Sequence, residues 1–195
     1  MEPAYIEEKT FDKTSFKDNP LIKGEYESCR FLNCDFSNMD LSDFKLTDCE
    51  FSACNLSLVN LTRTAFRDTK FTGCKMLGLH FESCNEFSLS FSFEHCILNH
   101  STFYRTKIKK TTFRNTQLQE VDFTECDLTE ALFDQCDLLR ATFENTILEK
   151  ADFRSSYSYS INPEINRIRK AKFSIYGTPG LLEKYDIIID STPSD

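Results

Sequence analysis

The stretch CRFLNCDFSNMDLSDFKLTDCEFSACNL, residues 29–56, repeats with a period of five residues. A large apolar side chain occupies every fifth position from Phe31 to Leu56, and four cysteines each lie two places before one of these side chains. Neither regular element has this period, because an α-helix repeats about every 3.6 residues and a strand every two. A chain that turns a corner every five residues would direct two side chains of each five inward and three outward. The period therefore predicts a coil built of short straight segments of five residues, which we call walls.

The same period covers most of the 195 residues. Every fifth position from Phe11 to Phe81 is large and apolar; the pattern fails at Glu86 and resumes two residues out of phase, from Phe93 to Phe153. Four walls of five residues make a coil of 20 residues, so side chains 20 apart should stack along one axis. We predict an all-β solenoid with four walls and about seven to eight coils, roughly 35 Å long at the usual strand spacing.

The wall pattern, approximately A(D/N)LXX, resembles that of the pentapeptide-repeat family over residues 11–153. Small or medium-sized residues fill the position two before each large one, and Asp or Asn often fills the position between them. The resemblance implies a right-handed quadrilateral β-helix, a fold in which each coil is covered by the next.

The period divides the chain into three segments. We expect residues 1–10 to form an N-terminal cap segment, residues 11–153 the β-helix, and residues 154–195 a capping and dimerisation segment of helices and a strand. Caps are needed because the open end of a solenoid exposes apolar core and unpaired backbone.

The register break at 82–92 adds two residues to the period. A simple register slip accommodates them, and so does a short bulge; a functional loop would need polar chemistry that the segment lacks. With a bulge or short excursion, we expect the three apolar residues Phe87, Leu89 and Phe91 to return to the core.

The residues after Phe153 follow different rules. Asn162 followed by Pro and Glu is typical of a helix start, which predicts a short helix over about 163–170. AKFSI, residues 171–175, is then expected as a last wall, followed by a second helix over PGLLEKY with Thr178 as its N-cap and by DIIID, residues 186–190, as a closing strand.

Composition excludes several classes of protein. The formal charge of −8 argues against direct binding of nucleic acid, which needs positive surface. No apolar run approaches the roughly 18–20 residues that span a bilayer, so no membrane partner is expected. The sequence MEPAYIEEKT lacks the basic-then-apolar pattern of a secretory signal, which predicts a cytoplasmic protein with reduced thiols.

All nine cysteines lie at the small inward position, where a thiol is a compact apolar filler. Two alternatives remain open. Cys34, Cys54 and Cys74 should stack in one column, close enough for a disulfide under oxidising conditions. Zinc could be bound by a set of histidines and cysteines that is plausible by residue type, although its histidines point outward and its cysteines inward. The set is His80, Cys84, His95, Cys96 and His100.

Catalysis finds no support in the sequence. There is no glycine-rich phosphate loop and no GxSxG or HExxH motif, and a packed quadrilateral core leaves no deep substrate pocket. We therefore expect no enzyme activity, no catalytic or metal-binding residues and no cofactor.

Acidic residues concentrate in the C-terminal part of the repeat region, whereas residues 105–114 form a basic belt. One interpretation is a partner-binding acidic face that offers phosphate-like charge to a DNA-binding groove. The other is a solubilising surface, because the position before each large residue favours Asp or Asn in any such repeat. The candidate acids are Glu120, Asp122, Glu125, Asp127, Glu130, Asp134 and Asp137.

The C-terminal tail carries more apolar surface than a cap needs, which predicts a homodimer contact. INPEINRI and GLLEKYDIII resemble the tail of microcin-immunity and Qnr-type quinolone-resistance proteins. That subgroup implies two rods joined end to end in a homodimer that imitates duplex DNA, binds DNA gyrase or topoisomerase IV and protects it from a toxin or quinolone. This sequence lacks the long projecting loops of strongly protecting Qnr-type proteins. The alternative to a topoisomerase-binding protein is a generic protein-interaction scaffold. The candidate dimer residues are Leu181, Leu182, Tyr185, Ile187 and Ile189.

Overall fold

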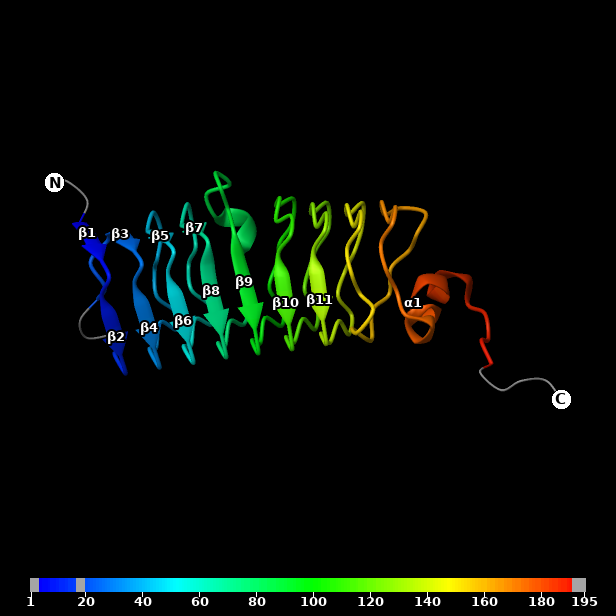
Figure 1. Ribbon diagram of the computed structural model, residues 1–195, viewed down its shortest axis with the longest axis horizontal. Coiled ribbons are helices and arrows are strands. Elements are labelled where there is room, and N and C mark those ends of the chain that lie inside the picture. Colours follow the sequence, from blue (N-terminus) through cyan, green and yellow to red (C-terminus); the bar gives the residue numbers. More distant parts are fainter. Residues whose placement is uncertain (1–3, 17–19, 191–195) are drawn as a thin grey trace.

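The computed structural model describes residues 4–16 and 20–190 as a row of stacked coils, with the two ends of the chain at opposite ends of the row (Figure 1). Each coil contributes very short strands to the stack. The strands are β1 (Ala4–Glu7), β2 (Thr10–Asp12), β3 (Gly24–Glu27), β4 (Arg30–Leu32), β5 (Lys45–Thr47), β6 (Glu50–Ser52), β7 (Ala65–Arg67), β8 (Thr69–Thr72), β9 (Phe91–Glu94), β10 (Thr112–Arg114) and β11 (Leu132–Asp134).

Every strand pairs in parallel with the strand one coil away. The order is β1-β3-β5-β7 in a four-stranded sheet and β11-β10-β9-β8-β6-β4-β2 in a seven-stranded sheet. Phe11 lies opposite Phe31, a step of 20 residues, whereas Phe71 lies opposite Phe93, a step of 22. The predicted parallel β-solenoid of 20-residue coils is confirmed, together with a two-residue insertion at the break.

Four walls enclose the core, and each is named here by the large residues at its centre. The first wall is centred on residues such as Phe31 and Phe113, the second on Phe36 and Leu118, the third on Leu41 and Phe123, and the fourth on Leu46 and Leu128.

The coils extend beyond both expected ends. β1 pairs with β3 in register, so residues 4–7, which were expected in an N-terminal cap segment, already form part of the first coil. Gly24 allows this pairing, because a Cβ there would lie 2.1 Å from the carbonyl oxygen of Ala4. At the other end, the ring of Phe173 stacks on that of Phe153 at 5.5 Å, so the core continues past the expected boundary.

Phenylalanine rings form continuous files inside the rod. On the first wall, rings one coil apart stack with centroids 4.5–5.5 Å apart and planes within 22° of parallel. The third-wall file meets it edge to face: the rings of Phe113 and Phe123 lie 6.0 Å apart at 79°. Both geometries are favourable for aromatic pairs. The two files hold 13 of the 19 phenylalanines of the sequence, nine on the first wall and four on the third.

Corners between walls depend on two recurring backbone devices. At most corners the residue two places after a wall centre has positive φ, as at Asn38 (60°) and Lys110 (61°). The residue before the centre is often Asp or Asn, whose side-chain oxygen accepts the N–H two residues later; Asp122 binds the N–H of Thr124 at 2.8 Å. Such side-chain turns compete well with other backbone pairings. The Asp and Asn of the repeat therefore shape its corners.

At the break, a large residue occupies a small residue's place. Phe91 lies opposite Thr69, in a column that elsewhere holds Cys49 or Ala131. The chain from Asn85 to Ser88 is exposed, so this coil has no large residue at the centre of its fourth wall. The Phe91 ring, 5.3 Å from that of Phe81, fills the space left in the core.

Two of the three apolar residues expected to return to the core at the break do so. Phe91 is buried and Leu89 packs partly buried against the core. The expectation for Phe87 is wrong: it is 72% exposed, with its ring 5.6 Å from the Arg67 guanidinium.

The predicted helix over 163–170 does not form. The chain instead makes a turn and a further wall, in which Arg167 bridges to Ile147 in parallel. The buried Asn166 amide makes this possible, because it accepts the Thr146 N–H at 2.8 Å and donates to the Phe143 carbonyl at 2.8 Å. Asn166 thus fills the small inward position of one more coil.

Short helical turns close the C-terminal end: η2 (Ile175–Gly177), α1 (Pro179–Leu182) and η3 (Glu183–Tyr185). The expected helix over PGLLEKY is therefore present as α1 and η3. Thr178 takes the N-cap position, but its hydroxyl donates to the Ser174 carbonyl at 3.3 Å instead of capping. The prediction of a closing strand at 186–190 is wrong, because these residues are exposed and pair with no strand in the described chain.

Candidate functional site

The seven candidate acids are distributed over all four walls. The five-residue period is the reason, since residues five apart lie on successive walls. Asp134 lies on the first wall, in β11. Asp137, Asp122 and Asp127 bridge into three separate ladders, on the second, third and fourth walls. The acids thus wind around the rod and do not form a single acidic face.

Most of these carboxylates are paired with a cation one coil away. Glu125 accepts from the Arg105 guanidinium at 2.7 Å, and Glu130 lies 2.7 Å from the Lys150 ammonium. These hydrogen bonds, more than the accompanying charge attraction, hold the pKa of both glutamates below its usual range. Glu120 pairs with Arg140 in the same way. Pairing reduces the net negative charge that a partner would meet.

The aspartates among the candidates are engaged in the corners. Asp122 and Asp137 each accept the backbone N–H two residues later. Asp127 accepts both the N–H and the hydroxyl of Thr129 and lies 3.2 Å from Lys109. Burial opposes ionisation of Asp127, but these hydrogen bonds outweigh it and lower its pKa. Asp134 lies 3.2 Å from Arg114, so residues of the basic belt, 105–114, form ion pairs with the candidate acids.

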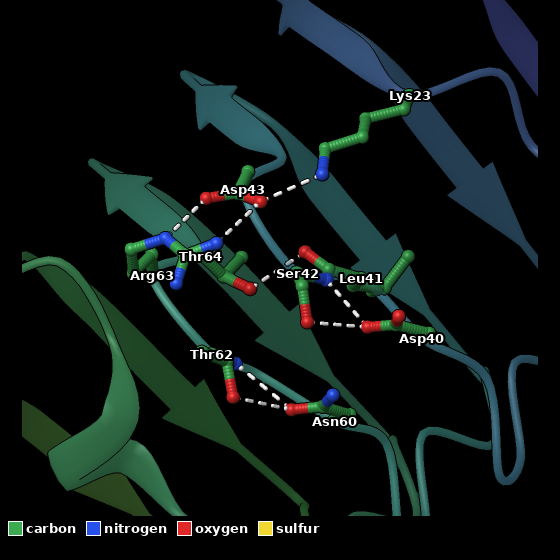
Figure 2. A network of polar contacts seen from close by, with 9 residues as sticks. All are labelled: Lys23, Asp40, Leu41, Ser42, Asp43, Asn60, Thr62, Arg63 and Thr64. Atoms are coloured by element: carbon green, nitrogen blue, oxygen red, sulfur yellow. Dashed lines mark hydrogen bonds and ion pairs between the residues drawn. The ribbon is translucent and has the colours of Figure 1, made fainter.

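The same construction recurs nearer the N-terminus, where Figure 2 shows a ladder on the third wall. The Asp43 carboxylate lies between Arg63, which donates 2.9 Å away through Nη2, and Lys23, 2.6 Å away on the other side. Hydrogen bonds from Arg63 and then Lys23 lower the pKa of Asp43 strongly. Ion pairs between adjacent coils thus occur on the third wall in both halves of the rod.

Neither alternative role for the cysteines gains support from the geometry. All nine thiols are free and buried. Cys34, Cys54 and Cys74 do share a column, and the backbone N–H of Cys34 points to the Cys54 sulfur at 3.4 Å. Burial raises the pKa of Cys49 and Cys126 to about 12, so these thiols stay protonated.

The proposed zinc ligands lie apart. His80, His95 and His100 are exposed beside acids, whereas Cys84 and Cys96 are in the core. Among the described residues no three His, Cys, Asp or Glu side chains are placed to hold a metal ion.

The surface hollows of the rod are shallow. One of about 290 Å³ lies beside the break and is lined by Asp68, Lys70, Phe91, Lys109 and Lys110, among others. A second, of about 570 Å³, lies beside the C-terminal segment. No helix in the described part of the chain is long and apolar enough to cross a membrane.

The C-terminal candidates divide into two groups. Leu181 and Leu182 are half-buried, and Leu181 packs against the core. Tyr185, Ile187 and Ile189 are about half exposed, at 50%, 54% and 48%. Ile187 and Ile189 line the larger hollow together with Leu182.

Sequence reasoning missed the most exposed apolar residues of this segment, Tyr176 at 92% and Ile188 at 98%. The expected strand placed Ile188 on the opposite side from its neighbours. The unbroken run of three isoleucines was the available signal.

The comparisons with known proteins place the chain among solenoids of this kind. The model of the pentapeptide repeat region matches residues 25–92 and 80–153. No curated protein matches the sequence.

Several solved structures are similar in fold, two of which are QnrB1 and HetL. Full-length QnrB1, a plasmid-mediated fluoroquinolone resistance protein, matches with a TM-score of 0.52 and 18% identity over 94% of this chain and 100% of its own. HetL, a pentapeptide repeat protein involved in heterocyst differentiation regulation from the cyanobacterium Nostoc sp. strain PCC 7120, matches with a TM-score of 0.60 and 14% identity over 89% of this chain and 88% of its own. At such identities the likeness shows the fold alone.

Proposed function

The chain belongs to the pentapeptide-repeat family, and on that premise we propose that it is a non-catalytic, protein-binding rod that associates as a homodimer and binds a type II topoisomerase. The observation that carries the binding role is the filled interior. Twelve of the largest side chains are fully buried phenylalanines, so only the outer walls and the rod ends are left for a partner. Flat walls with charges repeated at every coil suit recognition of an extended surface.

Topoisomerase, as DNA gyrase or topoisomerase IV, is the partner class that the tail resemblance and the fold of QnrB1 support. The third wall is the surface we assign to it, since acids exceed bases there, whereas bases exceed acids on the first wall. The third-wall acids are Asp40, Asp43, Glu82, Asp122, Glu125 and Glu144, against Lys23, Arg63 and Arg105. This narrows the candidate acids for DNA imitation to Asp122 and Glu125.

The homodimer is proposed through the C-terminal end. Tyr185, Ile187 and Ile189 present apolar surface beside a hollow at the end of the rod, and burying such surface is favourable by about 25 cal/mol per Å².

A supercoiling and drug-cleavage assay with gyrase tests the function. The chain at micromolar concentration should inhibit supercoiling or reduce quinolone-stabilised cleavage. Asp122→Asn with Glu125→Gln should weaken the effect, whereas the matched first-wall pair Glu50→Gln with Asp134→Asn should not. An unchanged gyrase reaction at these concentrations would remove the proposal.

A scaffold for a different protein is the second candidate. The pairing of the candidate acids with cations favours it, because a DNA imitation needs unneutralised charge. The fold is also at least as similar to that of HetL, with a TM-score of 0.60 against 0.52 for QnrB1, so likeness of fold alone does not favour a topoisomerase. Affinity capture that repeatedly recovers one protein other than a topoisomerase would support this candidate.

A further inference from the structure

The fourth wall is divided into an acidic and a basic half. The acidic half comprises residues 4–8, 24–28, 44–48 and 64–68, where β1, β3, β5 and β7 pair in register. The basic half comprises residues 106–110, 126–130, 146–150 and 166–170, joined by parallel bridges. The break loop, residues 84–90, separates the halves and projects from the row of coils (Figure 1).

The charges of the two halves are equal and opposite. The acidic half holds six acids against two bases, a balance of −4, and the basic half seven bases against three acids, a balance of +4. The acids are Glu7, Glu8, Glu25, Glu27, Asp48 and Asp68, against Lys45 and Arg67. The bases are Lys107, Lys109, Lys110, Lys150, Arg167, Arg169 and Lys170, against Asp127, Glu130 and Glu149.

Pairing inside the chain leaves charges at both ends of this wall. Lys45 pairs with Glu25, and Arg167 with Glu149. In contrast, Glu7 and Glu8 at one end and Arg169 and Lys170 at the other have no ion-pair partner among the described residues. All four side chains are exposed. The ends of the wall therefore keep opposite charges available for a partner.

An exposed aromatic residue lies near the middle of the wall. We call each five-residue segment of the fourth wall a rung. Phe87, in the break loop, is 72% exposed, and its ring lies against Arg67 of the adjacent acidic rung. A central aromatic residue surrounded by complementary charge is the usual composition of a protein-binding surface.

We propose that the fourth wall binds a second copy of this chain side by side and antiparallel, with the acidic half of each rod against the basic half of the other. A two-fold axis between the walls, perpendicular to the rods, places rung 4–8 of one copy opposite rung 166–170 of its partner and rung 64–68 opposite rung 106–110. Parallel rods would set like charges against each other. The antiparallel pairing is self-complementary, as a two-fold interface requires.

The dimensions of the wall predict a weak, reversible pair. Eight rungs about 4.8 Å apart and five residues of about 3.3 Å give on the order of 600 Å² per copy, below the roughly 800 Å² of a standard interface. This association is separate from the proposed rod-end dimer and does not depend on topoisomerase binding.

Sedimentation equilibrium tests the pair in a background that carries Ile187→Ser and Ile189→Ser to disable the rod-end contact. In low salt we expect a monomer–dimer equilibrium that weakens about tenfold when salt rises to about 0.5 M, since ionic screening acts on exposed charges. X-ray scattering should show a dimer with nearly the length of one rod, whereas an end-to-end dimer would double it. A chain that stays monomeric up to millimolar concentration in low salt would overturn the proposal.

A charge exchange gives the decisive outcome. Glu7→Lys with Glu8→Lys, and separately Arg169→Glu with Lys170→Glu, should each abolish pairing, because each homodimer then opposes like charges. An equimolar mixture of the two variants should dimerise again, since one end of the heterodimer has exchanged charges and the other is native. If the mixture stays monomeric, the assignment is wrong.

The matched control is Lys13→Glu with Lys75→Glu, which changes the net charge equally on the first and second walls and should leave pairing intact. Phe87→Ser should weaken pairing about fivefold or more without altering the circular dichroism of the monomer. A Phe87→Ser variant that pairs like its parent would place the interface away from the break loop.

Discussion

Apolar side chains are buried within the coils but largely exposed in the segment after Phe173. Within the coils, Phe113 and Phe133 are completely buried, because each wall is covered by the walls of the neighbouring coils. Beyond Phe173 no further coil follows within the residues described, which end at 190, and Tyr176 and Ile188 are almost fully exposed. Burial in a solenoid therefore depends on the next repeat, and the last apolar residues depend on a cap or a partner.

The largest expected effect is a loss of stability within the coils. Phe123→Ala removes a ring that stacks on Phe103 and Phe143 at 5.2 Å, and the cavity should lower the free energy of unfolding by about 3–5 kcal/mol. Urea denaturation measures it. Tyr176→Ala, beyond the coils, is the matched control and should change stability by less than about 0.5 kcal/mol. Equal losses in both variants would erase the distinction between the two regions.

The break coil should respond less strongly than a regular coil. Phe91→Thr restores the small residue of its column but leaves the space beside Phe66 and Phe81 unfilled, which should cost about 2–4 kcal/mol. Phe87→Ala, four residues away and exposed, should be nearly neutral. A neutral Phe91→Thr would mean that the break adapts as a loop and is not part of the core.

Alkaline pH should weaken the coils through their buried thiols. Burial raises the pKa of Cys126 to about 12 and that of Cys136 to about 11. In the unfolded chain a thiol loses its proton near pH 8.5, so above that pH the unfolded state binds fewer protons and stability falls. The slope is about 1.4 kcal/mol per pH unit for each such thiol, up to its folded pKa.

Urea midpoints measured at pH 7.5 and 9.5 give this slope. Cys126→Ala with Cys136→Ala should reduce it, although the variant is itself somewhat less stable at neutral pH. If the double variant keeps the parent slope, the thiols do not cause the alkaline loss.

The smallest effect on folding is expected at the rod surface. Asp43→Asn removes the negative charge shared by Lys23 and Arg63 on the third wall. Because both cations are exposed, the loss of stability should be slight and should disappear in high salt. Thermal melts at two salt concentrations measure it. A loss that persists in high salt would indicate that the ladders hold the coils together.

The coils were predictable because one rule is applied repeatedly. Each wall uses the same corner, so a single period fixes the pairing of every strand, the files of phenylalanines and the burial of the cysteines. The same rule would have shown that acids five residues apart, such as Asp122 and Asp127, lie on different walls, and that the fourth wall is divided by charge. A net charge summed along consecutive residues hides both features.

The exceptions were not predictable from the period. At the break, a vacant wall centre let Phe91 occupy a small residue's place, while Phe87 was left outside. In the tail, Asn162 and the following Pro and Glu indicated a helix, but the Asn166 amide satisfies buried backbone groups of the coil below and favours one more wall. Tertiary hydrogen bonds outweighed the local helix signal at that point.

The register across the break tests the whole account most directly. Nuclear Overhauser effects between phenylalanine rings, with selective labelling, measure it. The structure predicts strong contacts between Phe71 and Phe93, whose centroids are 5.4 Å apart, and between Phe81 and Phe103, at 4.4 Å. Contact of Phe71 with Phe91 in place of Phe93 would mean that the coils keep a 20-residue step, and it would contradict the solenoid described above.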